Sequence, residues 1–183
     1  MIAFVILHYR AADMTRKCVE RIKALEGDKK IVIVDNASPN GTGQELLDEY
    51  TEDSEIKVIL NPENSGFAKG NNMGVRWVQE NVPADFVVVL NNDVEILQKD
   101  FCPKVEAIYR RHSFDVLGPD IISVFSGIHQ NPKSLHGYSL ESVRKKREKV
   151  ARTKNPILLL LSSGEKNSPA IWKRVQRRRR AKQ

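Results

Sequence analysis

Residues 86–93 read Phe-Val-Val-Val-Leu-Asn-Asn-Asp, a short apolar run that ends abruptly in two amides and a carboxylate. Such a run, rich in β-branched residues, predicts a buried central strand of a parallel sheet. In open α/β sheets, ligands bind beyond the carboxyl ends of the strands. An aspartate and two asparagines at that point can hold a hard cation and the phosphates attached to it. The stretch therefore predicts a fold class and the edge of the sheet that carries the chemistry.

Apolar bursts alternate with helical patterns from the start of the chain. Strands are predicted at residues 2–7, 31–34, 56–60 and 86–90, and helices at residues 13–25, 42–50, 66–80 and 99–111. Thr42 and Glu45 have the spacing of a capping box at the start of the second helix. Four strand–helix units with short connections predict an α/β fold, a mostly parallel sheet with helices on both faces. Two further short strands are expected at residues 116–117 and 121–124.

The charge of the chain is divided unevenly along its 183 residues. Residues 1–138 carry 15 Lys and Arg against 20 Asp and Glu, whereas residues 139–183 carry 15 against 3. The helical and strand pattern also breaks near residue 126. We therefore expect a domain over residues 1–126, followed by an irregular segment and a basic helical tail over residues 127–183.

Cysteine usage and the first residues point to a cytoplasmic protein. Cys18 and Cys102 are the two cysteines, and they do not have the spacing of a CxxC metal or redox motif. A disulfide framework is not expected, and a reducing compartment fits. The apolar run at residues 2–7 is too short for a membrane span and lacks the basic segment and cleavage site of a signal peptide.

The loop after the second strand, residues 34–41, contains Asp35 and Asn36. One interpretation is a turn rich in Asp and Asn that leads into a helix. The other is that Asp35, placed just past a buried strand, accepts hydrogen bonds from a nucleobase or ribose, because a carboxylate offers only acceptors.

The loop after the third strand is richer in Asn and Gly than a helix start requires. Residues 64–74 hold three asparagines in addition to three glycines at positions 66, 70 and 74, at a cost in helix propensity. Capping accounts for one Asn and close packing for one Gly. A surface where backbone and amide groups approach a ligand accounts for all six, with Lys69 available for a phosphate or a base.

Taken together, four segments resemble the family 2 glycosyltransferases with the GT-A fold, particularly the rhamnosyltransferase-like members. They are residues 8–10 after the first strand, 34–38 after the second, 64–74 at the third helix and 90–93 after the fourth strand. The last segment, Leu-Asn-Asn-Asp, stands where the family has its metal-binding D-x-D motif. The resemblance covers roughly residues 1–125, and its four motifs follow in the family's order and spacing.

The resemblance implies a nucleotide-diphosphate sugar as donor and Mg²⁺ or Mn²⁺ as cofactor. Asp93 is expected to hold the cation and Asp35 to contact the base, while Lys69 is the expected direct contact from the third loop. The implied nucleotide-sugar-binding residues are His8, Tyr9, Arg10, Asp35, Asn36, Asn64, Gly66, Lys69, Asn72, Asn91 and Asn92. The expected activity is inverting transfer to a glycan or lipid-linked acceptor in cell-surface polysaccharide synthesis.

The segment that supplies the general base departs from the family's pattern. In the family a Gly-Gly-Phe-Asp-like segment and an aromatic Glu-Asp segment follow the metal motif, and neither form occurs after Asp93. The catalytic residue is therefore not identified. We expect the chain to hold the donor-binding half of a shortened or truncated protein and to catalyse little transfer alone.

The basic tail allows three interpretations. A basic helix is predicted at residues 140–154, and residues 177–180 are four consecutive arginines. The helix can be solvated and pack on the domain of a longer protein. The tail can instead attach the chain peripherally to the anionic inner face of the cell membrane, where each Lys or Arg contributes about 1 kcal/mol, with residues 157–161 and Trp172 as an interfacial anchor. Nucleic-acid binding is disfavoured, because no groove-reading motif or aromatic platform accompanies the charge.

Two alternatives to a glycosyltransferase remain open from the residues alone. A nucleotidyltransferase also places metal and nucleotide at the end of a parallel sheet, but it normally has a glycine-rich loop after the first strand, and residues 8–12 contain no glycine. The other alternative is a non-catalytic interaction module that carries the basic tail on an α/β scaffold.

Overall fold

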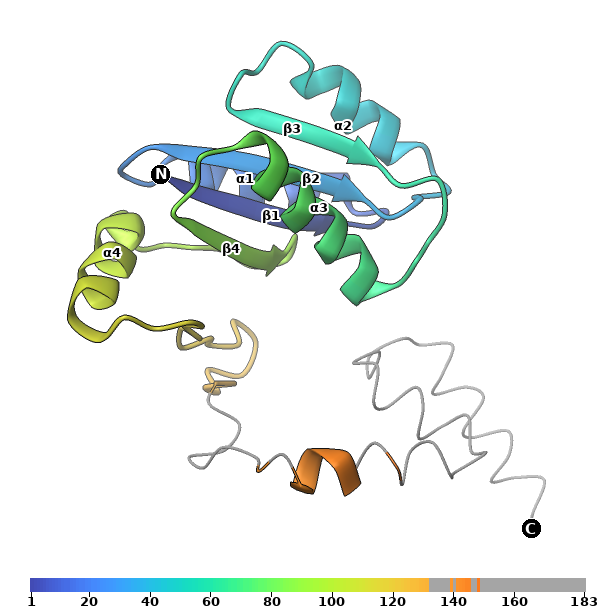
Figure 1. The fold of residues 1–183 in the computed structure, drawn as a ribbon. Helices are drawn as coiled ribbons and strands as arrows, with labels where there is room; N and C mark the ends of the chain where they lie inside the picture. Colours follow the sequence, from blue (N-terminus) through green and yellow to red (C-terminus); the bar gives the residue numbers. More distant parts are fainter. Residues whose placement is uncertain (132–138, 140, 146–147, 149–183) are drawn as a thin grey trace. The chain divides into compact units, whose positions relative to one another are not determined.

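The computed structural model describes residues 1–131, 139, 141–145 and 148 of the chain (Figure 1). The chain divides into two units, the first of residues 1–115 and the second beginning at Val116. The domain boundary expected after residue 126 stays a prediction. None of the described helices is both long and apolar enough to cross a membrane.

The first unit alternates strands and helices in the predicted order. All eight predicted elements form, and the four strands run parallel in the order β3-β2-β1-β4. The elements are β1 (Ile2–His8), α1 (Ala12–Lys23), β2 (Lys29–Asp35), α2 (Thr42–Tyr50), β3 (Ile56–Leu60), α3 (Phe67–Asn81), β4 (Phe86–Asn91) and α4 (Phe101–His112).

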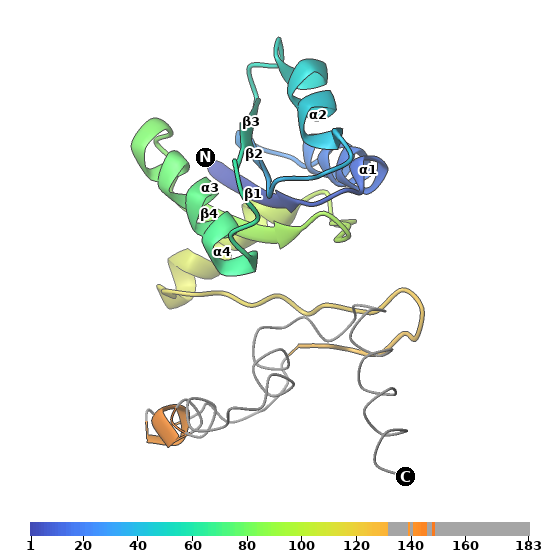
Figure 2. The same cartoon turned by 90° about the vertical axis from the view of Figure 1, so that its right-hand side faces the viewer.

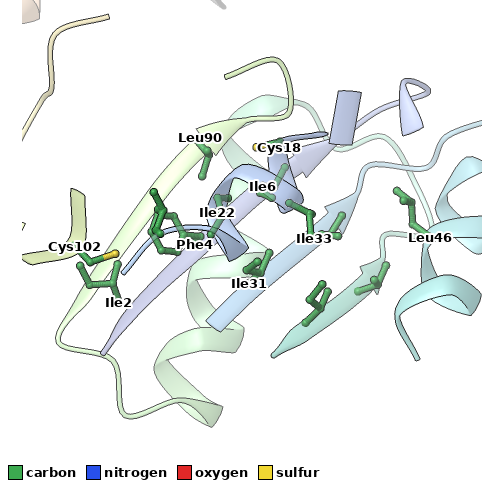
Figure 3. Close-up of a cluster of buried hydrophobic side chains, with 14 of the residues drawn as sticks. Ile2, Phe4, Ile6, Cys18, Ile22, Ile31, Ile33, Leu46, Leu90 and Cys102 are labelled. Atoms are coloured by element: carbon green, nitrogen blue, oxygen red, sulfur yellow. The ribbon is translucent and has the colours of Figure 1, made fainter. Parts of the chain in front are cut away.

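The sheet separates two apolar layers, because successive side chains of a strand point to opposite faces. On one face, Phe4 of β1, Ile22 of α1, Leu46 of α2 and Cys102 of α4 belong to one continuous apolar cluster (Figure 3). On the other face, Val5 packs with Val78 of α3. Figure 2 shows the sheet between α3 on one side and α1 and α2 on the other. Each fully buried large side chain contributes roughly 1.5–3 kcal/mol, so these two layers hold the unit together.

Two glycines let α3 approach the sheet closely. A Cβ atom at Gly70 would stand 2.6 Å from Cδ1 of Leu7, and one at Gly74 would collide with the side chains of Val5 and Val34. Both positions therefore require a residue without a side chain, although glycine lowers helix propensity by about 1 kcal/mol relative to alanine. Packing against the sheet accounts for two of the three glycines in this segment.

The strand at residues 86–91 is not central, contrary to the prediction. Among the described residues β4 pairs only with β1, so it forms one edge of the sheet. Val87 and Val89, on the face that α3 covers, are 37% and 47% exposed, whereas Leu90 is buried on the other face. An apolar run can therefore form an edge strand that is only partly covered, because α3 lies mainly over β1 and β2.

The capping box predicted at Thr42 is also wrong. The residue that caps α2 is Gly41, with a left-handed φ of 79°, and no side chain caps the helix. The Thr42 hydroxyl instead donates to Oδ1 of Asn40 at 2.8 Å and lies 3.0 Å from Nε2 of His8. The hydroxyl therefore joins the second helix to the first strand.

Three later elements differ from the expectation or lie outside the described part. Residues 116–117 form no strand, and residues 121–124 contribute only one antiparallel bridge, between Ile122 and His129. These stretches are too short to form a ladder of their own. Residues 141–145 and 148 are helical, and residues 149–183, including the apolar run at residues 157–161, lie outside the described residues.

The close approach of α3 leads to a stability prediction. Gly74→Ala should gain about 1 kcal/mol of helix propensity but add a methyl group that meets two valines, at a cost of about 1–3 kcal/mol. We expect a net lower free energy of unfolding, measured by urea denaturation monitored by circular dichroism. Gln79→Ala, at an exposed position of the same helix, should be neutral or slightly stabilising. Equal stability of the two variants would contradict the close contact.

Candidate functional site

The polar loops that follow the four strands meet at one edge of the sheet, because the strands are parallel. The register pairs His8 of β1 with Asp35 of β2, and Asp35 with Leu60 of β3. On the other side Leu7 pairs with Asn91 of β4. The structure therefore brings together the four segments that the sequence singled out.

His8 lies beneath this edge rather than on it. The side chain is wholly buried, and its Nδ1 is 2.7 Å from the hydroxyl of Thr15 while its Nε2 is 3.0 Å from the hydroxyl of Thr42. Burial lowers the pKa of His8, and the carboxylate of Asp35, 3.9 Å from Nε2, opposes that shift only in part. A neutral ring whose Nε2–H donates to Thr42 and whose Nδ1 accepts from Thr15 fits these contacts, with the single Thr15 hydroxyl proton directed to the ring at 2.7 Å rather than to the Ala11 carbonyl at 3.2 Å. In this conformation His8 joins β1 to α1 and α2 and presents no surface to a ligand.

Asp35 is buried and largely engaged by its own loop. Both carboxylate oxygens accept from the backbone N–H of Ser38, at 3.3 and 3.2 Å. A Cβ at Gly43 would overlap this carboxylate, so the backbone of α2 closes over it. The Asp-rich turn is thus present, and contact with a nucleobase stays a prediction that requires one of these oxygens to accept a second bond.

Asn36 organises the loop that leads into α3. Its Oδ1 accepts from Nδ2 of Asn61 at 3.1 Å and from the N–H of Ser65 at 3.3 Å, and its Nδ2 donates to Oδ1 of Asn64 at 2.9 Å. Asn64 in turn accepts from the N–H of Gly66, whose φ of 83° starts the helix. Three asparagine side chains therefore fix the backbone of this loop.

Asn61 and Ser65 are site residues that sequence reasoning passed over. Asn61 is buried, and its amide also donates to the Ser65 hydroxyl at 2.9 Å. A signal was available, because Asn61 follows the third strand as directly as Asp35 ends the second. Their role is to position the loop, since their hydrogen bonds run within it and to Asn36 of the loop after β2.

The loops after β1 and β2 are tied together in a strained conformation. Arg10 and Ala37 have positive φ angles of 68° and 58°, which non-glycine residues adopt rarely and which are enriched at functional sites. The N–H of Arg10 donates to the hydroxyl of Ser38 at 2.8 Å, and the amide of Asn40 donates to the Arg10 carbonyl at 2.9 Å. The guanidinium of Arg10 lies 4.9 Å from the ring centre of Tyr9, and both side chains are exposed. Tyr9 and Arg10 therefore form a cationic and aromatic surface at the predicted site.

Two hollows border these loops. The larger, of about 570 Å³, runs between α3 and β3, and the predicted residues Lys69 and Asn72 are among its lining. The smaller, of about 410 Å³, lies where α1 and α2 begin, beside Arg10. Both reach the size range of small-molecule sites, about 300–1,000 Å³.

The tip after β4 divides into one structural amide and two exposed groups. Nδ2 of Asn92 donates to the hydroxyl of Thr15 at 3.1 Å and to the carbonyl of Ala11 at 3.4 Å, which ties β4 to α1. Within the described ranges, the side chains of Asn91 and Asp93 are exposed and have no hydrogen-bonding partner. Asn92 therefore fixes the tip against α1, whereas Asn91 and Asp93 are available to a ligand.

The chemistry of this tip fits a cation held jointly with a phosphate ligand. No cluster of three or more His, Cys, Asp or Glu side chains that could hold a metal occurs in the part of the chain that the structure describes. Mg²⁺, however, is commonly bound by one or two carboxylates together with substrate phosphates and waters. The free carboxylate of Asp93 and the adjacent amide oxygen of Asn91 meet that requirement.

Comparison with known proteins identifies the family. The family model described as Glycosyl transferase family 2 matches residues 3–164. The chain belongs to glycosyl transferase family 2. Membership confirms the predicted resemblance and favours it over a nucleotidyltransferase and over an unrelated interaction module.

The similar proteins are longer than this chain. The low-salt glycan biosynthesis hexosyltransferase Agl10 of Haloferax volcanii is 26% identical over 122 residues, which cover 67% of this chain and 37% of that protein. Structures of S. aureus TarS 1–349 with UDP and with UDP-GlcNAc match with a TM-score of 0.51 and 18% identity, over 61% of this chain and 32% of theirs. The structural likeness confirms the predicted GT-A fold, and this chain matches about a third of each relative.

The burial of His8 predicts a pH dependence of stability. Because its pKa is lowered in the folded state, the unfolded chain binds more protons below its ordinary pKa of about 6.5. The contribution of His8 to stability is therefore complete above that pH and is lost as the pH falls. We expect the free energy of unfolding to decrease from pH 7.5 to 5.5, by at most about 1.4 kcal/mol per pH unit, in urea titrations.

Two histidine variants test whether His8 causes this pH dependence of the free energy of unfolding. His8→Gln should be less stable at pH 7.5 and should lose most of the pH dependence, whereas His112→Gln, at the exposed end of α4, should keep it. A slope that is unchanged in His8→Gln would show that another group causes it.

Proposed function

We propose that this chain binds the nucleotide-diphosphate sugar donor of an inverting, metal-dependent glycosyltransferase that acts in cell-surface polysaccharide synthesis. One observation carries the proposal: in a chain of glycosyl transferase family 2, the polar loops after all four strands meet at one sheet edge. Parallel α/β sheets bind their ligands at that edge. The UDP and UDP-GlcNAc complexes of TarS, which shares the fold, support a nucleotide sugar as the ligand class.

The residues divide the work of binding by their free hydrogen-bonding capacity. Lys69, exposed at the first turn of α3, and Arg10, exposed after β1, are cations that can reach phosphate or base. Asn36 and Gly66 fix the conformation of the loop directly before α3, through their hydrogen bonds to residues 64 and 65. Asp35 would supply a carboxylate acceptor beneath this loop, where it is desolvated and its bonds are strengthened.

Asp93, with Asn91 beside it, would hold Mg²⁺ or Mn²⁺ against the diphosphate. When bound, the cation neutralises charge that develops on the departing diphosphate, a contribution of several kcal/mol. Its position directly after β4 suits this task, because Asn92 fixes the tip against α1 while Asp93 stays exposed.

Transfer also requires a base that this part of the chain does not obviously provide. In an inverting reaction the acceptor oxygen attacks the anomeric carbon, the bond from that carbon to the diphosphate oxygen breaks, and a base takes the proton of the acceptor hydroxyl. Several later carboxylates in the described ranges form ion pairs, among them Glu95 with Arg21 at 3.1 Å and Asp100 with Lys104 at 3.0 Å, whereas the exposed Asp115 forms none with a described residue. We therefore propose that this chain alone binds the donor but transfers little sugar to a glycan or lipid-linked acceptor.

Calorimetry with UDP, dTDP and GDP, each with and without Mn²⁺, tests donor binding. At least one diphosphate should bind, and more tightly with Mn²⁺. Asp93→Asn should abolish the effect of Mn²⁺ and weaken binding about tenfold or more, or about 1.4 kcal/mol. Asp48→Asn, an exposed carboxylate on α2, should bind as the unmodified chain does. The absence of binding in every combination would overturn the proposal, and rapid transfer to a glycan acceptor would overturn its donor-only part.

For location, we propose a cytoplasmic protein that attaches peripherally to the anionic inner face of the membrane through its basic tail. The support is the excess of Lys and Arg after residue 138 and the attraction of such clusters to anionic lipid. The full chain should sediment with vesicles that contain phosphatidylserine and not with neutral vesicles. Replacing the four arginines at residues 177–180 by Gln should reduce this sedimentation. Equal sedimentation of both chains with both vesicles would contradict the attachment.

A further inference from the structure

The hollow between α3 and β3 extends well beyond the predicted donor residues. One end of the hollow lies near Asn61, at the carboxyl ends of the strands. The other end follows α3 toward the last turns of that helix, as far as Glu80. The lining consists of Ile59, Asn61, Glu63, Ser65, Lys69, Asn72, Met73, Arg76, Trp77 and Glu80. We call this hollow the α3–β3 groove.

The charged side chains of the α3–β3 groove are left without partners. The side chains of Glu63, Lys69, Arg76 and Glu80 form no hydrogen bond or ion pair with any residue that the structure describes. Arg76 and Glu80 stand four positions apart on one helix, a spacing at which opposite charges commonly pair. On the opposite face of the sheet Arg16 pairs with three carboxylates at 2.6–3.1 Å. The groove thus keeps its polar groups available.

Trp77 places an aromatic ring in the middle of these groups. The ring is half-buried, packs on the apolar layer beneath α3 and lines the groove. The ammonium groups of Lys30 and Lys57 each lie 6.0 Å from its centre. A large flat apolar surface surrounded by planar carboxylate, amide and guanidinium groups can receive a ring with apolar C–H groups on its faces and hydroxyls on its rim.

We propose that the α3–β3 groove binds an uncharged saccharide chain, with a sugar ring stacked on Trp77 and its hydroxyls bonded to Arg76 and Glu80. The lining holds two cations and two carboxylates, and Lys30 and Lys57 add two cations beside the Trp77 ring. Saccharide hydroxyls can donate to the carboxylates and accept from the cations, whereas the carboxylates of Glu63 and Glu80 would repel a polyanion such as a nucleic acid. Its volume of about 570 Å³ lies within the range of small-molecule sites. The groove would hold a glycan at Trp77, Arg76 and Glu80, beyond its donor end at Lys69 and Asn72, independently of transfer.

Fluorescence of Trp77 tests the proposal directly. The chain has two tryptophans, so full-length Trp172→Phe leaves Trp77 as the reporter. Maltotetraose, cellotetraose, mannotetraose and chitotetraose are titrated up to about 10 mM, so that millimolar dissociation constants are detected. At least one should produce a saturable change in emission without nucleotide or Mn²⁺. A folded protein that responds to none of the four, or that responds only to heparin or oligo-dT, overturns the proposal.

Variants in the same background assign the response to the groove. Arg76→Gln and Glu80→Gln are exposed changes that should leave the circular dichroism unchanged and weaken the saccharide about tenfold or more each, since each removes a charged hydrogen bond. Gln79→Ala, exposed on α3 and outside the groove, should bind as the parent does. Unchanged affinity in both groove variants overturns the proposal. Neither residue belongs to the predicted donor site, so UDP binding and saccharide binding succeed or fail separately.

Discussion

The position of α3 on the sheet determines the rest of the first unit. The helix lies directly on β1 and β2 because Gly70 and Gly74 present no side chain to Leu7 and Val5. The same contact brings the start of α3 close to Asn36, since a Cβ at Gly70 would also come within 3.5 Å of the Asn36 amide. The loop before α3 and the first turn that carries Lys69 are therefore placed by a packing contact in the core and secured by amide hydrogen bonds.

The same placement leaves both sheet edges partly uncovered on that face. On the side of β3 it leaves the α3–β3 groove, in which Trp77 and Ile59 are only half-buried. On the side of β4 it leaves Val87 and Val89 partly exposed. One helix cannot cover four strands, because neighbouring strands are about 4.8 Å apart and a helix with its side chains is about 10–12 Å wide.

The opposite face is held by buried polar contacts as well as by apolar packing. His8, Thr15 and Thr42 link β1 with α1 and α2, and Asn92 extends the link to β4. A neutral His8 suits this role because both ring nitrogens then have a partner of the correct kind, which removes the penalty for burying them. Burial also raises the pKa of the nearby Cys18 thiol to about 12, so it packs as a small apolar group.

Much of the fold could be predicted from the sequence because its determinants are local. The period of apolar residues gave every strand and helix of the first unit, and short connections gave the parallel sheet. The edge position of β4 could not be predicted, since strand order depends on contacts between distant residues. The capping box failed for a related reason: the Thr42 hydroxyl has a tertiary partner, His8, that the local spacing does not reveal.

The sequence predicted where the site residues lie, but it predicted less well which of them bind a ligand and which hold the loops. An Asp or Asn after a strand can serve the ligand or the loop, and the two cases have the same sequence signature. The structure distinguishes them by the hydrogen bonds already formed. The side-chain amides of Asn36 and Asn92 form hydrogen bonds with neighbouring segments, whereas the side chains of Asn91 and Asp93 form none with the described residues.

This distinction has an energetic basis. A group that is already bonded can bind a ligand only by exchanging one hydrogen bond for another, so its net gain is small. An exposed group that has no protein partner exchanges only water for the ligand, so it gives up no contact that holds the loops and needs little reorganisation. Asp93 meets this condition on the tip that Asn92 fixes, and Lys69 meets it in the first turn of α3, directly after the loop that Asn36 fixes. The family motif therefore contains both kinds of residue: those with internal hydrogen bonds fix the conformation of the loops, and those without them are available to bind the ligand.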